Sequence, residues 1–252
     1  MNIKERDFMK RLLFTILLIF LHNMAFAQDT LVFGKVEENF DQLVSAEILK
    51  VVYQKLDLPV EIIDMPGKRS LKESNEGHID GEVTRITEVS SEYPNLIKVP
   101  TPINYIEPSV FSIKSLTDIS GCQSLKNYRI AIVRGLKHAE LCTKKLSQVK
   151  VVNHLTKAFK LLEAERVDIV ITSKINGLYL SNKLGLKTVK IASPSLSHLP
   201  VYHFVNKKHK ALVPRINKLL LSMQANKTLS QLREEIITRL VNDKQLNIYH
   251  IK

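Results

Sequence analysis

The chain has 252 residues, 44% of them hydrophobic, and its 37 Lys and Arg against 25 Asp and Glu give a formal net charge of +12 at pH 7. A basic balance of this size can indicate nucleic acid or a membrane surface as a partner. However, the Lys residues are scattered, and no DNA- or RNA-binding motif accompanies them. We therefore interpret the charge mainly as a solvated surface with a mild bias towards anionic ligands, and we expect no nucleic-acid role.

The first 27 residues have the pattern of a secretory signal peptide. Basic residues precede the apolar run at 12–21, and Ala25-x-Ala27 supplies a small-residue cleavage pattern before Gln28. The run is shorter than the roughly 20 residues that a membrane span needs, although an uncleaved anchor remains the alternative. We predict a signal peptide over 1–27 and a soluble mature chain in the periplasm.

The first half of the mature chain reads as alternating strands and helices. Strands are predicted at 29–37, 59–66 and 79–85, and helices at 40–56 and 68–76. The segment 96–114 contains prolines and has no helical period, so we expect it to be extended.

The second half repeats the alternation. Strands are predicted at 128–135, 149–154, 167–173 and 187–193, and helices at 137–146, 156–165 and 175–185. The segment 201–209 is again extended, and the tail from Lys210 to Val241 reads as two helices.

A strand–helix–strand–helix–strand order thus occurs once before the extended segment 96–114 and once after it. The near-echo of EGHIDGEVTRI (76–86) in AERVDIVITSK (164–174) marks the same helix-to-strand step in each half. Alternation of this kind predicts an α/β fold of two lobes, each with a mostly parallel sheet flanked by helices.

We predict that 28–110 form the first part of lobe 1, that 111–197 form lobe 2, and that 198–252 return to lobe 1 with the C-terminal helices. The extended segments 96–114 and 195–207 are then the crossing strands and the hinge. Two lobes joined in this way enclose a cleft, where ligands commonly bind.

The chain contains two cysteines, Cys122 and Cys142. Cys122 precedes a predicted strand, and Cys142 lies in the helix that follows and runs back alongside that strand. They could form a disulfide that closes a loop of about 20 residues, and export would favour it. Two buried free thiols are the alternative; we expect no metal site.

At this point the sequence resembles the type II periplasmic solute-binding proteins, the family of the amino-acid-binding components of ABC importers. The resemblance covers essentially the whole mature chain. It is carried by the order and spacing of LKESNEGHIDG, YRIAIVRGLKHAE, LLEAERVDIVI and YHFVNKKHKALVPRINKLLLSM. It implies a two-lobed binding protein that captures a small solute between its lobes.

The anchors that hold an amino acid in this family are missing at the matching positions. The neighbourhood expected to contain an Arg for the ligand carboxylate reads SSEYPN, and the position expected to contain an acidic residue for the ammonium is Ser173. Leu136 and Lys137 stand where the family often has Thr or Ser.

Basic residues near the predicted cleft are the leading candidates for ligand binding. Arg85 ends a predicted strand, Arg69 opens a helix, and Arg134 and Gly135 lie where a strand passes into a helix, a place that favours anions. A guanidinium group suits carboxylate or phosphate. For each Arg the alternative is a surface position or an inter-lobe salt bridge.

Other residues are candidates for lining the cleft: Tyr105, Asn104, Glu37, Phe40, Thr172 and Ser173. Strand packing and turn chemistry are the alternative for Tyr105 and Asn104. We interpret Asp80 and Asp168 as structural turn residues, because they begin strands at the end away from the cleft.

Enzyme motifs such as Gly-x-Ser-x-Gly and His-Glu-x-x-His do not occur in the sequence. His138, His154, His203 and His209 lack the spacing of zinc ligands, so we expect no cofactor. The resemblance favours a monomeric solute-binding protein for a small polar, anionic or amino-acid-like ligand, with an inner-membrane importer or sensor as partner. A periplasmic enzyme on the same fold, dehydratase-like, and an envelope protein that binds another protein are the alternatives.

Overall fold

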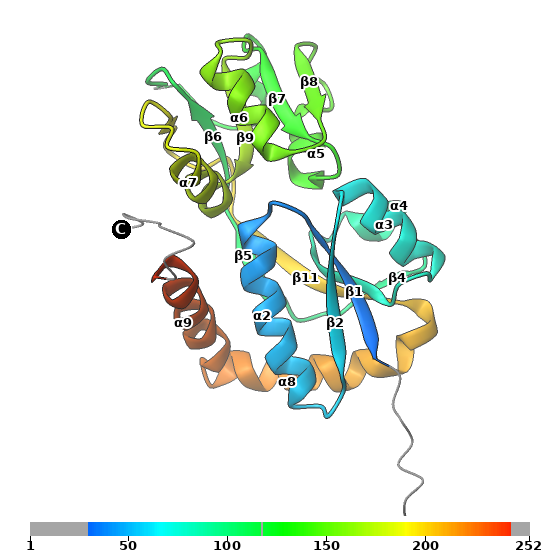
Figure 1. The fold of residues 1–252 in the computed structure, drawn as a ribbon. Helices are drawn as coiled ribbons and strands as arrows, with labels where there is room; N and C mark the ends of the chain where they lie inside the picture. The colour runs from blue at the N-terminus through cyan, green and yellow to red at the C-terminus, as the bar shows by residue number, and fades with distance from the viewer. Residues whose placement is uncertain (1–29, 117, 243–252) are drawn as a thin grey trace, which may run out of the picture. The chain divides into compact units, whose positions relative to one another are not determined.

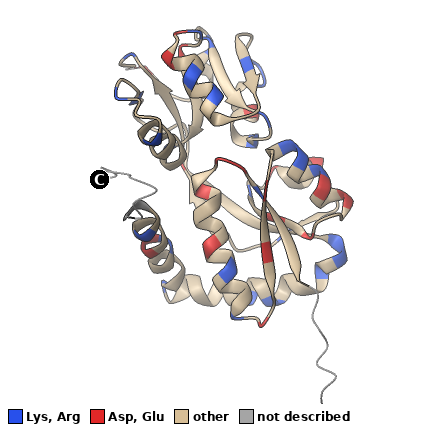
Figure 2. Ribbon diagram, in the orientation of Figure 1, with Lys and Arg blue, Asp and Glu red and all other residues tan. Residues whose placement is uncertain are grey.

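The computed structural model describes residues 30–116 and 118–242. The predicted signal peptide at 1–27 lies outside the described residues. Within the described part of the chain, no helix has the length and apolarity needed to cross a membrane. Figure 2 shows Lys and Arg distributed over both halves of the structure and interspersed with Asp and Glu, as the scattered pattern in the sequence indicates.

In the described residues the strands form two sheets, each with its own helices (Figure 1). The first sheet has the order β2 (Val60–Met65), β1 (Leu31–Val36), β3 (Gly81–Arg85), β11 (Leu199–Asn206) and β4 (Leu96–Lys98), and β5 (Asn104–Ile106) also pairs with β11. β1 is parallel to β2 and β3, whereas β11 is antiparallel to β3. The helices that accompany this sheet are α2 (Phe40–Gln54), α3 (Gly67–Glu76) and the short α4 (Val89–Glu92).

The second sheet has the order β10 (Lys190–Ile191), β6 (Pro108–Ser112), β9 (Ile169–Ser173), β7 (Ile130–Val133) and β8 (Val149–Val152). β7 is parallel to β8 and β9, while β6 is antiparallel to β9. The elements that accompany it are the 3₁₀ turn η1 (Cys122–Leu125), α5 (Lys137–Thr143), α6 (Leu155–Glu163) and α7 (Lys174–Lys183). We call the two sheets with their helices the first and second lobes.

The predicted α/β fold is therefore confirmed, with β1-α2-β2-α3-β3 in the first lobe and β7-α5-β8-α6-β9 in the second. The second sheet begins with β6 at Pro108, inside the segment 28–110 that the sequence assigns to lobe 1. The helix α4 and the break between β4 and β5 were not predicted.

After β11 the chain continues beside the first lobe. A 3₁₀ turn, η2 (Lys207–Leu212), leads into α8 (Val213–Ala225) and α9 (Thr228–Asn242). Arg215 donates a hydrogen bond to the carbonyl of Leu56 at 3.3 Å, and Arg239 of α9 pairs with Glu47 of α2 at 3.1 Å. Figure 1 shows α9 beside α2 and α8 crossing near the end of α2.

The near-echo in the sequence has a structural cause, which is a repeated carboxylate anchor. Asp80 precedes β3 and accepts a hydrogen bond from the backbone N–H of Val32 at 2.7 Å. Asp168 precedes β9 and accepts one from the N–H of Arg129 at 2.8 Å. In both lobes the carboxylate therefore fastens the third strand of the unit to the first, which confirms the structural interpretation of both Asp residues.

Cations reinforce both anchors. A hydrogen bond from Arg129 lowers the pKa of Asp168. Burial would raise the pKa of Asp80, but hydrogen bonds from Lys208, the backbone of Val32 and His209 together hold it below its usual value. Both carboxylates therefore remain ionised at neutral pH and keep their bonds to the first strand.

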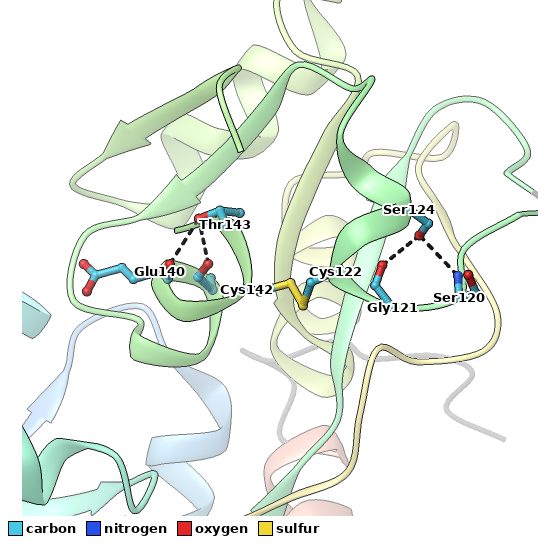
Figure 3. Close-up of a disulfide and its surroundings, with 8 residues drawn as sticks. Ser120, Gly121, Cys122, Ser124, Glu140, Cys142 and Thr143 are labelled. Carbon is cyan, nitrogen blue, oxygen red and sulfur yellow. Dashed lines mark hydrogen bonds between the residues drawn. A yellow bond between two sulfur atoms is a disulfide. The ribbon is translucent and has the colours of Figure 1, made fainter. Parts of the chain in front are cut away.

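The predicted disulfide is present between Cys122 of η1 and Cys142 of α5 (Figure 3). The Cα atoms of the two residues are 5.2 Å apart, within the usual range of about 4.4–6.8 Å. The alternative of two free thiols is thereby removed. The crosslink ties α5, which borders the cleft, to the turn before β7, with a stabilisation of about 3 kcal/mol for a loop of this length.

Candidate functional site

A small cavity lies where the two lobes meet and where β5 and β11 cross between them. Its volume is about 40 Å³. The residues that line it are Asn39, Asp41, Gln42, Thr84, Arg85 and Ile86 from the first lobe, Gly135, Leu136, Lys137, His138 and Ser173 from the second, and Ile106 and Val201 from the crossing strands. Side chains of both charge signs thus face one space between the lobes.

The lobes are in direct contact around this cavity. The backbone N–H of Phe40 donates to Asn176 of α7 at 2.9 Å, and the hydroxyl of Ser173 donates to the carboxyl of Asp41. Further out, Lys137 of the second lobe pairs with Glu92 of the first at 2.6 Å. The structure is therefore a closed arrangement of the lobes.

Gly135 lies at a close backbone approach between the lobes. Its φ is +83°, in the region that favours glycine, and a Cβ at this position would lie 2.4 Å from the backbone nitrogen of Lys68 and 2.5 Å from the carbonyl carbon of Gly67. A residue with a side chain could not occupy this position while the lobes are closed. Gly135, a predicted site residue, therefore contributes its backbone to the cavity wall.

Arg85, the leading candidate from the sequence, does line the cavity, but its charge is balanced inside the protein. Its Nε and Nη2 bind Glu82 at 2.8 and 2.7 Å. Nη1 donates to the carbonyl of Gly135 and Nη2 to the carbonyl of Gly67, both at 3.2 Å. Of the five N–H groups of the guanidinium, one on Nη1 remains for a ligand.

Asp41 is a site residue that the sequence analysis missed. Asn39 caps α2 by accepting a hydrogen bond from the N–H of Gln42 at 3.0 Å, and this cap places Asp41 in the first turn of the helix, facing the second lobe. Burial raises the pKa of Asp41 to about 6, although the bond from Ser173 and the charge of Arg233 act in the opposite direction. The Asn-x-x-Gln cap before an apolar run was the signal in the sequence that could have located it.

His138 is the second residue that the sequence analysis missed as a site residue. Its Nε2 atom is buried at the cavity and has no hydrogen-bond partner among the described residues. Burial lowers the pKa of His138 to about 4, so the ring is neutral at physiological pH. A buried ring nitrogen without a partner is a polar group that a ligand or a water can satisfy.

Arg69 and Arg134 do not line the cavity. Both lie beside a wider hollow of about 810 Å³ at the outer rim of the lobe contact, with Lys68, Lys72 and His154. The side chain of Arg69 is exposed and lies 3.8 Å from Glu73. Contact of Arg69 or Arg134 with a ligand remains a prediction.

The other predicted candidates have structural partners. Glu37 lies 3.1 Å from His154 of the second lobe, Thr172 accepts a hydrogen bond from Asn176 at 3.2 Å, and Phe40 is buried against Tyr179. These contacts lie at or near the lobe contact, but none of the three residues lines the cavity. Ser173 does line it, through its bond to Asp41.

Tyr105 and Asn104 belong to β5 but do not line the cavity. The amide of Asn104 binds Ser45 at 3.0 Å and Arg233 at 2.8 Å. Tyr105 stacks on His198 with ring centroids 4.4 Å apart. Side chains alternate between the faces of a strand, and since Ile106 faces the cavity, Tyr105 faces the opposite side.

Among the residues that the structure describes, no group of three or more His, Cys, Asp or Glu side chains is arranged to hold a metal ion.

Two α/β lobes, joined by crossing strands and with a cavity between them, define the fold of the type II periplasmic solute-binding proteins. The ligand-binding core of GluR0 in complex with L-glutamate is one solved structure with this fold; it is 18% identical to this chain, with a TM-score of 0.71 and coverage of 83% of this chain and 98% of that one.

Further similar structures include an ancestral arginine-binding protein bound to arginine, with 22% identity, a TM-score of 0.69 and coverage of 82% and 97%. Another is a histidine kinase sensor domain with similarity to periplasmic binding proteins, with 15% identity, a TM-score of 0.69 and coverage of 83% and 96%. No family model and no curated protein sequence matches this chain. At these identities the structures establish the fold of the chain.

The raised pKa of Asp41 gives a pH-dependent prediction. Its folded-state value of about 6 exceeds the ordinary 3.8, so between these pH values the folded protein holds a proton that the unfolded chain has released. The stabilisation from this proton is fully present below the unfolded pKa and is lost as the pH rises through the folded pKa. We expect Asp41→Asn to gain roughly 3 kcal/mol of stability relative to wild type between about pH 4 and about pH 7.

Urea denaturation of both proteins across this pH range measures the difference. Because His138 and His203, with pKa values lowered to about 4, titrate in both proteins, the comparison largely cancels their contribution. A difference that does not change with pH would show that Asp41 ionises normally.

Proposed function

We propose that the chain is an extracytoplasmic solute-binding protein whose lobes close on one small polar solute. The observation that carries this proposal is the cavity between the lobes, because groups from both lobes and from the crossing strands line it together. Closure about the crossing strands would be a hinge motion, and it would bury the solute among these groups.

The size of the cavity supports a cycle of opening and closing. A volume of about 40 Å³ holds a few water molecules, since one water needs roughly 10–15 Å³ by the same measure. An amino acid is several times larger. The solute would therefore enter while the lobes are apart, and the side chains that line the cavity would rearrange around it when the lobes close.

The lining groups favour an amino-acid-like solute within the broader class of small polar and anionic compounds. Asp41 presents a carboxyl that can accept from an ammonium group. The remaining N–H of Arg85 and the Nε2 of His138 can donate to a carboxylate, provided that His138 takes the Nε2–H tautomer. Because Glu82 already balances the charge of Arg85, a purely anionic solute has weaker complementarity here.

A ligand panel tests this function. The chain from Gln28 onward is melted with amino acids, dicarboxylates, sugar acids and phosphorylated metabolites, and each compound that shifts the melt is then titrated by calorimetry. A compound at 100 times its dissociation constant should add about 2.7 kcal/mol of stability. We expect an amino acid from the panel to raise the melting temperature. We also expect the bound compound to be recovered unchanged.

Matched variants locate the binding. Asp41→Asn removes a charge from the cavity at nearly constant shape and should weaken binding at least roughly tenfold, since hydrogen bonds to charged groups contribute about 1.5–3 kcal/mol. Arg69→Ala, outside the cavity, should leave the affinity unchanged. Chemical turnover of the bound compound would indicate a periplasmic enzyme instead. A panel without any response would contradict the proposal and favour a protein partner in the envelope.

The cellular setting follows from the same proposal. A periplasmic monomer would present its closed form to an inner-membrane importer or to a sensor. The presence of a histidine kinase sensor domain among the similar structures supports testing a sensor as well as an ABC importer.

A further inference from the structure

A second cavity, distinct from the one between the lobes, lies beside the crossing strands. Its volume is about 290 Å³, which approaches the range of small-molecule sites, roughly 300–1,000 Å³. Its walls come from β5, from the start of β11 and the residues before it, and from the end of α8 and the start of α9. We call it the hinge cavity.

The hinge cavity and the cavity between the lobes have no lining residue in common. Ile106 and Val201 line the inter-lobe cavity, whereas Tyr105 and Pro200 line the hinge cavity together with Asn104, the partner of Val201. A ligand in the hinge cavity would therefore not compete with a solute between the lobes.

The hinge cavity has an apolar floor and a polar mouth. Ile103 and Leu229 are buried in its wall, and Gln224 and Ser230 are exposed residues that also line it. Tyr105 is covered on both faces, because His198 stacks on it at 4.4 Å and the Arg233 guanidinium lies 4.2 Å from its ring centroid. The Tyr105 ring is therefore a fixed part of the wall.

The charge of the hinge cavity is positive. Arg233 lines it with a side chain that is only 9% exposed. Its Nε donates to Asn104 at 2.8 Å, and its Nη1 pairs at 2.7 Å with Glu234, which is 68% exposed. Its Nη2 has no hydrogen-bond partner among the described residues, and none of the described residues that line the cavity is acidic. A buried guanidinium with free N–H groups favours an anionic group.

We infer that the hinge cavity is a second ligand site, for a small organic acid that lays an apolar or aromatic body on Ile103 and Leu229 and its carboxylate on Nη2 of Arg233. The exposed position of Gln224 and Ser230 gives such a compound a way in. Bound there, the acid would brace α9 against the crossing strand β5, since Arg233 belongs to the helix and Tyr105 to the strand.

Benzoate is the probe for this site, and benzamide is its uncharged match in size and shape. Binding is followed by NMR on the chain from Gln28 onward, through shift changes of the His198 ring and nuclear Overhauser contacts between the probe and the methyl groups of Ile103 and Leu229. We expect benzoate to bind at least tenfold more tightly than benzamide. Equal binding of the two probes would overturn the charge assignment, and absence of contacts to these methyl groups would overturn the site.

Variants distinguish ligand binding in the hinge cavity from the structural role of Arg233. Arg233→Gln should lose the preference for benzoate over benzamide. Because Arg233 also holds Asn104, a second variant is needed, and Ser230→Trp fills the cavity from an exposed position on α9. It should abolish benzoate binding, whereas Ser222→Trp, exposed on α8 and outside the cavity, should leave it intact. Benzoate binding that survives Ser230→Trp would overturn the proposal.

Discussion

Replacing Glu82 by alanine is expected to lower the free energy of unfolding by roughly 3–5 kcal/mol, the usual effect of removing one partner of a buried ion pair. Glu82 is fully buried and pairs with Arg85, which is 4% exposed in its side chain. Glu82 also accepts hydrogen bonds from Ser70 and Ser74, both at 2.7 Å. The variant would leave the Arg85 charge without its counter-ion and the Ser70 hydroxyl without its acceptor in the interior, whereas Ser74 would keep the carbonyl of Ser70.

Urea denaturation measures this loss, and the chain offers a matched control on the neighbouring helix. Glu73→Ala removes a 3.8 Å pair with Arg69 and a 2.9 Å contact with His78, both of them exposed partners, and should cost less than about 1 kcal/mol. The double variant Glu82→Leu/Arg85→Met should recover much of the stability that Glu82→Ala loses, because it removes both charges. A loss below about 1 kcal/mol for Glu82→Ala would show that water reaches Arg85 and replaces its partner.

Replacing Gly135 by alanine is expected to prevent the lobes from closing. The added Cβ would meet the backbone of Gly67 and Lys68 at 2.4–2.9 Å, a contact that backbone atoms cannot relieve by rotating a side chain. The affinity for a solute scales with the fraction of molecules that can close, so we expect a loss of at least roughly tenfold. Small-angle scattering without ligand should give a larger radius of gyration than for wild type.

The control for Gly135→Ala is Gly185→Ala. Gly185 also has a positive φ, +69°, but a Cβ there would meet no atom within 4 Å. Both variants therefore introduce backbone strain of about 1–2 kcal/mol, and only Gly135→Ala introduces a clash between the lobes. If the two variants had the same scattering profile and the same affinity, the contact at Gly135 would have no part in closure.

The sequence predicted the repeated α/β units, the crossing strands and the disulfide, because each of them leaves a local signal. These signals are the periodicity of apolar residues, the positions of proline and glycine, and a short spacing between residues along the chain. It did not predict the Glu82–Arg85 pair. In a regular strand residues three apart point to opposite faces. Between Glu82 and Arg85, however, β3 has one more residue than the stretch of β11 from Phe204 to Tyr202 with which it pairs, and this bulge turns both side chains to the same side.

Only some of the residues of the candidate site could be predicted from the sequence, for a related reason. Arg85, Gly135 and Ser173 were identified from their places at the ends of strands. Asp41 and His138 lie in the first turns of helices, and what gives them a role is the lobe that they face. Which groups meet across an interface depends on the tertiary arrangement, which no local pattern records.

The repeated carboxylate anchor has a mechanical consequence. Because Asp80 ties β3 to β1 and Asp168 ties β9 to β7, each lobe is fastened by bonds that stay within it. The contacts between the lobes are a separate set: ion pairs at the rim, hydrogen bonds such as those from Ser173 to Asp41 and from Phe40 to Asn176, and the close backbone approach of Gly67 and Gly135. The chain can therefore lose the second set while keeping the first, and the lobes would swing as intact bodies with amide protons in β1 and β7 still protected from exchange.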